Sequence, residues 1–166
     1  MGPISQPSQG SSKAHHTHLA GTNLVAECGF DELETNVLEI ARLFCLAFAD
    51  PKSEAWIDAL RRAEQVFPIP FGATIANAVL IALNDMRVSR TRMFTYTSPR
   101  CSDCVRHITD EERYLISALH SMRQGNRGAA KTHCMLLCEG GDATRLLASL
   151  ERIAIITGDV ETPKYN

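Results

Sequence analysis

The stretch ATIANAVLIALNDMRVS, residues 73–89, is apolar on nearly all sides until Asp85. A surface helix carries one apolar stripe, whereas a helix that is apolar all round is buried among several neighbours. Almost no period-two alternation, the mark of a half-buried strand, occurs anywhere in the chain. We therefore predict a central helix that begins near Pro70 or Phe71, and we expect it to be the most buried element of an all-α fold.

Two helices are predicted before this central one. The first begins at a capping box, in which Asp31 caps the helix and Glu34 reaches back to it, and it ends near Asp50. The second begins with Asp50 as its N-cap and Pro51 at its first position, and it stops at the PIP sequence of 68–70. The first helix carries an apolar stripe made of Leu33, Val37, Ile40, Ala41, Phe44 and Phe48.

Three helices are predicted after the central one. Thr109 and Glu112 form a second capping box at the start of the fourth helix. A fifth helix spans about 128–139, and a sixth begins at Asp142 and ends at Gly158. The predicted fold class is therefore all-α with about six helices. A three-helix N-terminal part and a three-helix C-terminal part are joined by a loop that contains cysteine and histidine.

Composition indicates the boundaries of these parts. The first 27 residues are rich in Ser, Gln, Gly, Pro and His, and they have too few large apolar groups to offset the entropy lost on ordering. Long connections are uncommon in compact domains unless they carry a function. The predicted parts are a disordered tail over 1–27, an N-terminal helical part over 28–92, an Arg-rich and Cys/His loop over 93–108 that could include a short extended piece at 93–97, a C-terminal three-helix part over 109–158, and a flexible C-terminus over 159–166.

Length and composition limit the class of protein. With 166 residues, of which 45% are hydrophobic and 22% charged, the chain can bury an ordinary core. Its longest apolar stretch, residues 76–83, is far shorter than the roughly 18 to 20 residues that span a bilayer. The N-terminal segment lacks the basic and apolar regions of an export signal. We expect a cytoplasmic protein with no membrane span.

The cysteines are the main chemical feature of the sequence. Cys101 and Cys104 form a C-x2-C pair, a spacing that recurs in structural zinc sites because a short turn brings both sulfurs to one centre. A second pair is spaced i and i+4, and therefore lies on one face of the predicted fifth helix. The predicted zinc ligands are Cys101, Cys104, Cys134 and Cys138, with His107 or His133 as substitutes.

Other interpretations of the cysteines stay open. Cysteine often packs in a core as a small apolar side chain, which accounts for the fifth-helix pair but less well for the pair in the polar loop. The loop pair could form a dithiol redox switch, since Arg100 and Arg106 would favour the thiolate. An iron–sulfur cluster also takes four thiolates, although its signatures usually place three cysteines close together.

The segment 87–106 suggests nucleic acid as an alternative partner. Its arginines are interleaved with Phe94 and Tyr96, and arginines bind phosphates while aromatic rings stack on bases. A near-neutral pI of about 6.3 and the lack of a clear helix-turn-helix weigh against this interpretation. The residues that would contact nucleic acid are Arg87, Arg90, Arg92, Arg100 and Arg106.

No nucleotide-binding, hydrolase or metalloprotease motif is present in the sequence. We therefore expect a non-enzymatic, small cytoplasmic regulatory or adaptor protein. In this hypothesis a structural zinc site clips the loop to the fifth helix, and the protein acts on a protein partner. The alternatives are a nucleic-acid-binding transcriptional regulator that uses the Arg-rich segment and a thiol-based redox sensor.

Overall fold

A computed structural model describes the backbone of residues 23–161 and the side chains of residues 23–158. Most of the predicted tail and the end of the predicted C-terminus lie outside the described residues. Residues 23–27, which the sequence places in the tail, form a short strand and one turn of 3-10 helix. The elements are β1 (Asn23–Leu24), α1 (Glu32–Ala49), α2 (Ala55–Val66), α3 (Phe71–Ser89), β2 (His107–Ile108), α4 (Asp110–Arg123), α5 (Arg127–Leu137) and α6 (Thr144–Glu161).

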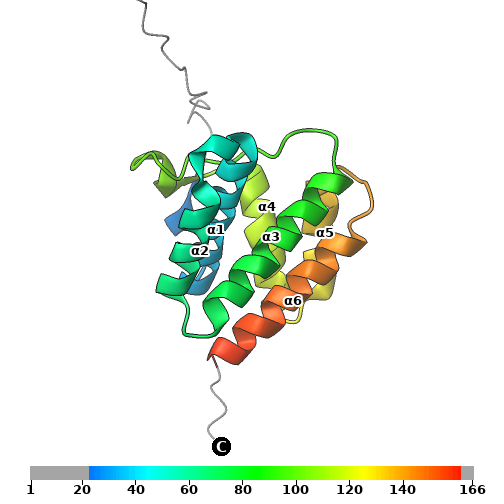
Figure 1. Cartoon of the computed structure of the whole chain (residues 1–166). Helices are drawn as coiled ribbons and strands as arrows, with labels where there is room; N and C mark the ends of the chain where they lie inside the picture. The colour runs from blue at the N-terminus through cyan, green and yellow to red at the C-terminus, as the bar shows by residue number, and fades with distance from the viewer. Residues whose placement is uncertain (1–22, 162–166) are drawn as a thin grey trace, which may run out of the picture.

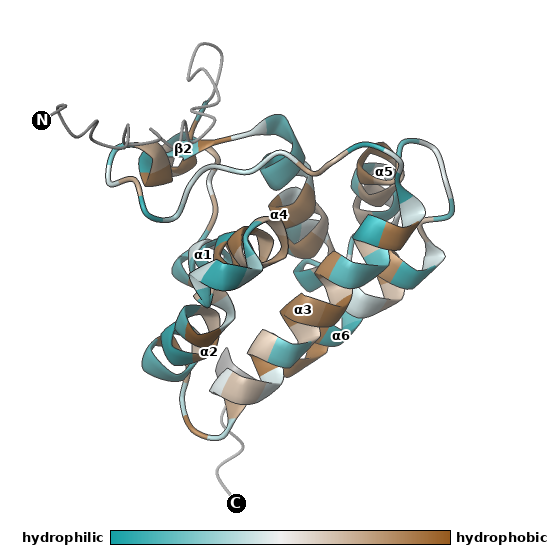
Figure 2. Cartoon of the chain, turned by 45° about the horizontal axis from the view of Figure 1, so that its top comes forward, coloured by the Kyte–Doolittle hydropathy of each residue, from teal (hydrophilic) through white to brown (hydrophobic). Residues whose placement is uncertain are grey.

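The prediction of an all-α fold with about six helices is confirmed. Helix α3 lies in the middle of the bundle, where it packs against α1 and α2 on one side and against α6 on the other (Figure 1). Helix α4 contacts α1, α5 and α6, so the two predicted three-helix parts meet along a broad boundary. A single hydrophobic core contains residues from all six helices. Figure 2 shows hydrophobic stretches along α3 and α4, both of which lie among other helices.

The prediction that α3 is the most buried element is wrong. Nine of its residues are buried, whereas α1 buries ten residues and is one residue shorter. Helix α3 has an outer face on which Ile81 is 37% and Val88 is 66% exposed. Helix α1 contacts α2, α3 and α4, and its buried set includes three polar side chains. The apolar sequence of α3 therefore predicted its central position correctly, but it did not predict that α1 is more buried.

Both predicted capping boxes are present. The Asp31 carboxylate accepts a hydrogen bond from the backbone N–H of Glu34 at 2.8 Å, and the Glu34 carboxylate accepts one from the N–H of Asp31 at 3.1 Å. Thr109 and Glu112 make the same reciprocal pair at the start of α4, at 3.1 and 2.9 Å. These contacts satisfy N–H groups that a helix leaves without intrahelical partners at its first turn.

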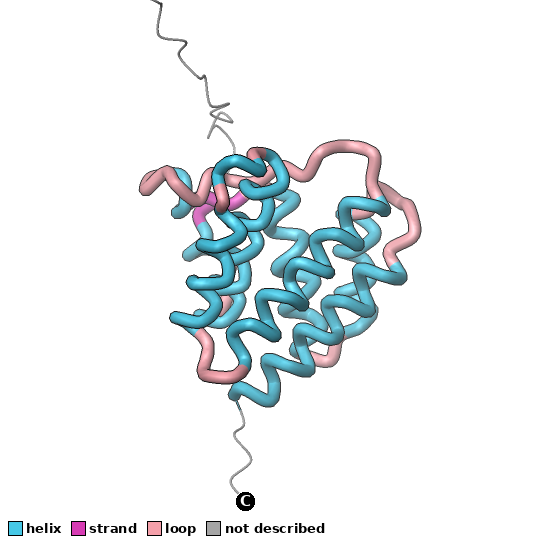
Figure 3. Tube along the Cα trace, in the orientation of Figure 1, coloured by secondary structure: helices cyan, strands magenta, loops and turns pink. Residues whose placement is uncertain are grey.

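Three local predictions are wrong. The sixth helix does not end at Gly158, because the backbone of α6 continues to Glu161. Asp50 and Pro51 begin a 3-10 turn (Pro51–Ser53) rather than α2, because the chain then passes through Glu54 in a left-handed conformation at φ 53°. Residues 93–97 form no strand. The short sheet instead pairs β2 with β1 in antiparallel register, with Asn23 opposite Ile108 (Figure 3). The residue pattern of the long connection gives no sign that its strand pairs with the segment before α1.

The close approach of α3 to α2 depends on Gly72. A Cβ atom at this position would lie 2.8 Å from the carbonyl oxygen of Ala63 and 2.9 Å from the Cα of Glu64, both of which are backbone atoms. Backbone cannot yield as a flexible side chain does. We expect Gly72→Ala to lower the free energy of unfolding by about 1–3 kcal/mol, the usual cost of overpacking.

The matched control for this prediction is Gly128→Ala in the first turn of α5. The nearest atom to a Cβ there is the side-chain oxygen of Asn126 at 3.8 Å, so the methyl group has room. Alanine favours the helix, and the variant is expected to be unchanged or stabilised by up to about 1 kcal/mol. Urea denaturation of both variants measures the difference, and equal effects would contradict the packing argument.

Candidate functional site

The long connection between α3 and α4 carries the C-x2-C motif over one end of the bundle (Figure 1). Cys101 and Cys104 are joined by a disulfide, with 5.1 Å between their Cα atoms, and both residues are half-buried. A tight turn positions them, since the N–H of Val105 donates to the carbonyl oxygen of Cys101 at 3.1 Å. The N–H of Cys104 donates to the Sγ atom of Cys101 at 3.2 Å.

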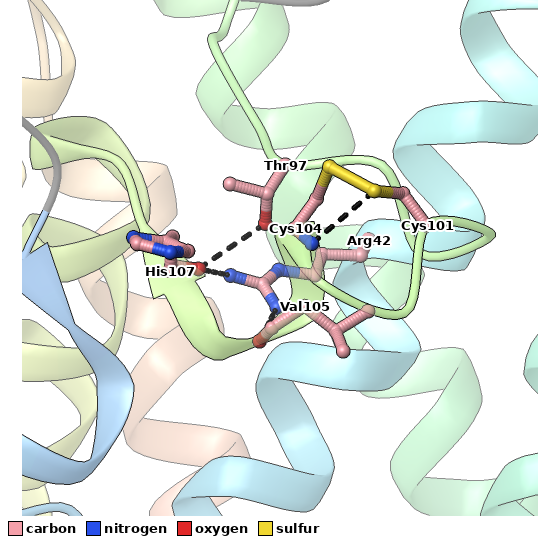
Figure 4. Close-up of a disulfide and its surroundings, with 6 residues drawn as sticks. All are labelled: Arg42, Thr97, Cys101, Cys104, Val105 and His107. Atoms are coloured by element: carbon pink, nitrogen blue, oxygen red, sulfur yellow. Dashed lines mark hydrogen bonds between the residues drawn. A yellow bond between two sulfur atoms is a disulfide. The ribbon is translucent and has the colours of Figure 1, made fainter. Parts of the chain in front are cut away.

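The side chain of Arg42 holds this loop to the core. Arg42 lies on α1, its side chain is 2% exposed, and its guanidinium points into the loop (Figure 4). It donates to the carbonyl oxygens of Val105 at 2.9 Å and of His107 at 2.6 Å. The same guanidinium forms an ion pair with Glu112 on α4, at 2.7 Å from Nε to Oε1. Buried charges are normally paired and hydrogen-bonded, and Arg42 satisfies both conditions.

Glu112 fixes the other end of the loop. Its Oε1 accepts from the N–H of Thr97 at 3.1 Å, and its Oε2 accepts from the N–H of Thr109 at 2.9 Å. The Thr97 hydroxyl lies 3.4 Å from the carbonyl oxygen of His107, as Figure 4 shows. The buried Arg42–Glu112 pair thus anchors both ends of residues 97–108, a segment we call the cysteine loop. The disulfide closes the part of the loop that lies between these anchors.

The structure does not bring the two predicted cysteine pairs together. In residues 23–158, no group of three or more His, Cys, Asp or Glu side chains is placed to hold a metal ion. Cys134 and Cys138 are 0% and 1% exposed and belong to the hydrophobic core. Burial raises the pKa of the Cys134 thiol to about 12, which disfavours the thiolate that a metal needs. The predicted four-ligand zinc site therefore receives no support, and core packing accounts for the α5 pair.

The two histidines proposed as substitute ligands also have other positions. His107 lies in β2, where its backbone carbonyl accepts from Arg42. The ring of His133 on α5 stacks on that of Tyr114 on α4, with 6.2 Å between the ring centroids. Burial is the main cause that lowers the pKa of His133. Neither histidine joins a cluster that could hold a metal within the described part of the chain.

No family model, no curated protein and no solved structure matches this chain. The residues themselves must therefore indicate the function. None of the helices in residues 23–161 is long and apolar enough to cross a membrane.

Two of the arginines proposed for nucleic acid are paired with acidic residues. Arg90 donates to the carbonyl oxygen of Arg92 at 2.9 Å and forms an ion pair with Glu111. Arg92 pairs with Glu139 at 2.6 Å. Hydrogen bonds from the side chain and backbone of Thr91, followed by one from Arg92, lower the pKa of Glu139 to about 2. These contacts hold the start of the long connection, at Thr91 and Arg92, to Glu139 just after α5.

The other three arginines of this set differ in their surroundings. The guanidinium of Arg87 lies 4.2 Å from the ring centroid of Phe48. Arg100 donates to the carbonyl oxygen of Ser53 at 2.9 Å, and Arg106 is exposed on the cysteine loop. Four of the five arginines thus contact other groups of the chain. They do not form an open row of guanidiniums of the kind that follows a phosphate backbone.

The sequence analysis missed Arg42, the residue that organises the site. Its one visible signal is that it is the sole basic residue of a helix with an otherwise wide apolar surface. Leu38 and Cys45, one turn away on either side, are both buried and share its face. Lys and Arg are almost never fully buried unless they are paired, so a base on such a face indicates a buried carboxylate elsewhere in the chain.

Proposed function

We propose that this protein is a non-enzymatic regulatory protein that senses thiol redox state through Cys101 and Cys104. The observation that carries the proposal is the disulfide between these two half-buried residues. The other four cysteines are free, and Cys45, Cys134 and Cys138 are buried. Redox-sensing cysteines are accessible and lie next to a resolving cysteine, and the loop pair alone meets both conditions.

Cys101 is the proposed nucleophile. The backbone N–H of Cys104 donates to its sulfur at 3.2 Å, and a hydrogen bond to the charged form favours the thiolate. The Cys101 thiolate attacks a peroxide, breaks the O–O bond and becomes a sulfenic acid. The Cys104 thiol then displaces the hydroxyl group as water, and the S–S bond forms. Two thiols and one hydrogen peroxide thus give one disulfide and two waters, with two electrons passing from sulfur to oxygen.

The anchors of the cysteine loop make the two redox states structurally distinct. Arg42 and Glu112 hold the backbone at residues 97, 105 and 107 to the core in a way that does not involve the sulfurs. Breaking the disulfide therefore releases only the turn between these points. A partner that recognises this turn would distinguish the oxidised from the reduced protein. An exchange with a dithiol reductant returns the loop to its reduced form.

Mass spectrometry after thiol alkylation tests the redox step. Full-length protein is reduced, freed of reductant and equilibrated in glutathione buffers of increasing potential. We expect a reversible Cys101–Cys104 disulfide that is lost in Cys101→Ser and retained in the matched control Cys134→Ala. A sulfenic acid on Cys101 should be trapped by dimedone in Cys104→Ser. Two free thiols in strongly oxidising buffer, or stoichiometric zinc bound to the protein, would contradict the proposal.

Limited proteolysis tests the structural consequence. Trypsin cleaves after arginine, and Arg100 and Arg106 lie within the cysteine loop. Arg100 lies in the turn that the disulfide restrains, so we expect faster cleavage after it in the reduced protein. The bond after Arg106 lies between the two carbonyl groups that Arg42 holds, so its cleavage should change little. Cleavage after Arg61, which is exposed on α2, should not depend on the redox state. Identical loop cleavage in both states would show that the disulfide does not change the surface that a partner meets.

A further inference from the structure

A second feature, distinct from the disulfide, lies where the long connection leaves α3. There the chain passes the ends of α1 and α3 and borders a cleft of about 260 Å³. Pockets for drug-sized molecules begin at roughly 300 Å³, so this slightly smaller cleft has room for a small ligand or for the planar part of a larger one. No acidic residue lines the cleft. We call it the Arg/aromatic cleft, and its characteristic lining residues are Phe48, Arg87, Arg90, Arg92, Phe94 and Tyr96.

Arg90, which lines this cleft, has one hydrogen-bond donor without an acceptor. Its side chain is only 3% exposed, and its Nη1 atom is buried with no hydrogen-bond partner. Its other nitrogens are used, since Nε donates to the carbonyl oxygen of Arg92 and Nη2 pairs with Glu111. Buried N–H groups nearly always have a partner, so an unpaired one beside a cleft is a candidate donor to a ligand. An anionic oxygen is the acceptor that a guanidinium binds most strongly.

The charges around the cleft favour an anion. Glu111 and Glu139 pair with Arg90 and Arg92, and they leave the charge of Arg87 uncompensated among the residues that meet there. The guanidinium of Arg87 is exposed and stacks over the Phe48 ring at 4.2 Å from its centroid. A guanidinium fixed in this way keeps its N–H edge available to a ligand.

The aromatic residues favour a planar ligand. Phe48, Phe94 and Tyr96 are all half-buried, so each ring presents part of its surface to solvent. The guanidinium of Arg90 lies 5.7 Å from the ring centroid of Phe94, beside the unpaired Nη1. Aromatic rings and guanidinium planes both stack on flat π systems. The lining thus combines a stacking surface with cationic donors.

We propose that the Arg/aromatic cleft binds a small planar aromatic anion. The anionic group accepts hydrogen bonds from Arg90 Nη1 and Arg87, and the ring stacks on Phe48 and Phe94. Two sources supply this chemistry, an aryl carboxylate and a nucleoside monophosphate. This inference goes beyond the proposed redox function and does not depend on it, because neither cysteine of the loop lines the cleft.

Isothermal titration of the full-length protein with 1-naphthoate and with adenosine monophosphate tests the proposal. We expect at least one of them to bind with a Kd below about 1 mM, and the better ligand identifies the source. Inorganic phosphate and the neutral 1-naphthalenemethanol should bind at least about tenfold more weakly. Phosphate has no ring to stack, and the alcohol carries no negative charge. No binding by either probe up to about 5 mM, or equal binding of the neutral analogue, would overturn the proposal.

Substitutions assign the binding to the cleft. Arg87→Met and Phe94→Ala are each expected to weaken the better ligand about tenfold or more, the size of one charge-assisted or stacking contact. Arg87 has no ion pair with any of residues 23–158, so this variant should fold, as circular dichroism would verify. The matched control Arg61→Met removes an exposed arginine of α2 and should leave affinity unchanged. Equal weakening by Arg87→Met and Arg61→Met would contradict binding in the cleft.

Discussion

Arg42→Ala is expected to lower the free energy of unfolding by about 3–5 kcal/mol, the cost of removing one partner of a buried ion pair. Glu112 is 1% exposed, so its carboxylate would remain in the core without its counter-charge. The carbonyl oxygens of Val105 and His107 would also lose the hydrogen bonds that Arg42 donates to them. Each contribution has the same sign, which makes this one of the largest effects of a single substitution in the chain.

Urea denaturation of three variants separates the causes. The control Arg61→Ala removes an exposed arginine 3.9 Å from Asp58 and should change stability by less than about 1 kcal/mol. The double variant Arg42→Met with Glu112→Gln removes both charges and should recover part of the loss, because no uncompensated charge remains. An Arg42→Ala variant as stable as Arg61→Ala would show that the pair does not anchor the cysteine loop.

Signals that lie within one segment made most of the fold predictable. A capping box involves residues three apart, and an apolar face repeats every three to four residues, so both are visible in a short window. The predicted start of α2 was wrong because Glu54 adopts a left-handed conformation that its residue type does not indicate. The strand at His107–Ile108 was not predicted because its partner strand precedes α1, more than 80 residues earlier in the chain.

The candidate site was predictable only in part for the same reason. The loop cysteines were identified because nothing apolar around them explained two thiols, and the structure joins them. The i, i+4 spacing made Cys134 and Cys138 equally good candidates for metal ligands, yet their thiols are buried in the core. Glu112 was assigned to a helix cap, and its second role opposite Arg42 depends on a contact across 70 residues. Periodicity shows which residues lie on one face of a helix. It does not show which distant side chain pairs with a buried charge on that face.

The second large effect is expected at Leu83 on α3. Its side chain is 1% exposed and lines a small void together with Val37 of α1, Leu119 of α4 and Leu150 of α6. Leu83→Ala would enlarge this void, and four helices meet around it, so the site cannot readily collapse. We expect a loss of about 3–5 kcal/mol in the free energy of unfolding, at the upper end for such substitutions. The control Val88→Ala shortens an exposed side chain of α3 and should change stability by less than about 0.5 kcal/mol.

The form of the unfolding transition adds a test of how the helices are organised. The side chains around Leu83 come from both predicted three-helix parts, so its removal weakens contacts inside the N-terminal part and contacts between the two parts. If the parts unfold together, the variant should show one transition at lower urea with the same slope, by circular dichroism and by fluorescence of Trp56 on α2 alike. Trp56 reports on the N-terminal part only. A fluorescence transition that separates from the helical signal would mean that the two parts have independent stability, and that α3 packs against α6 without coupling them.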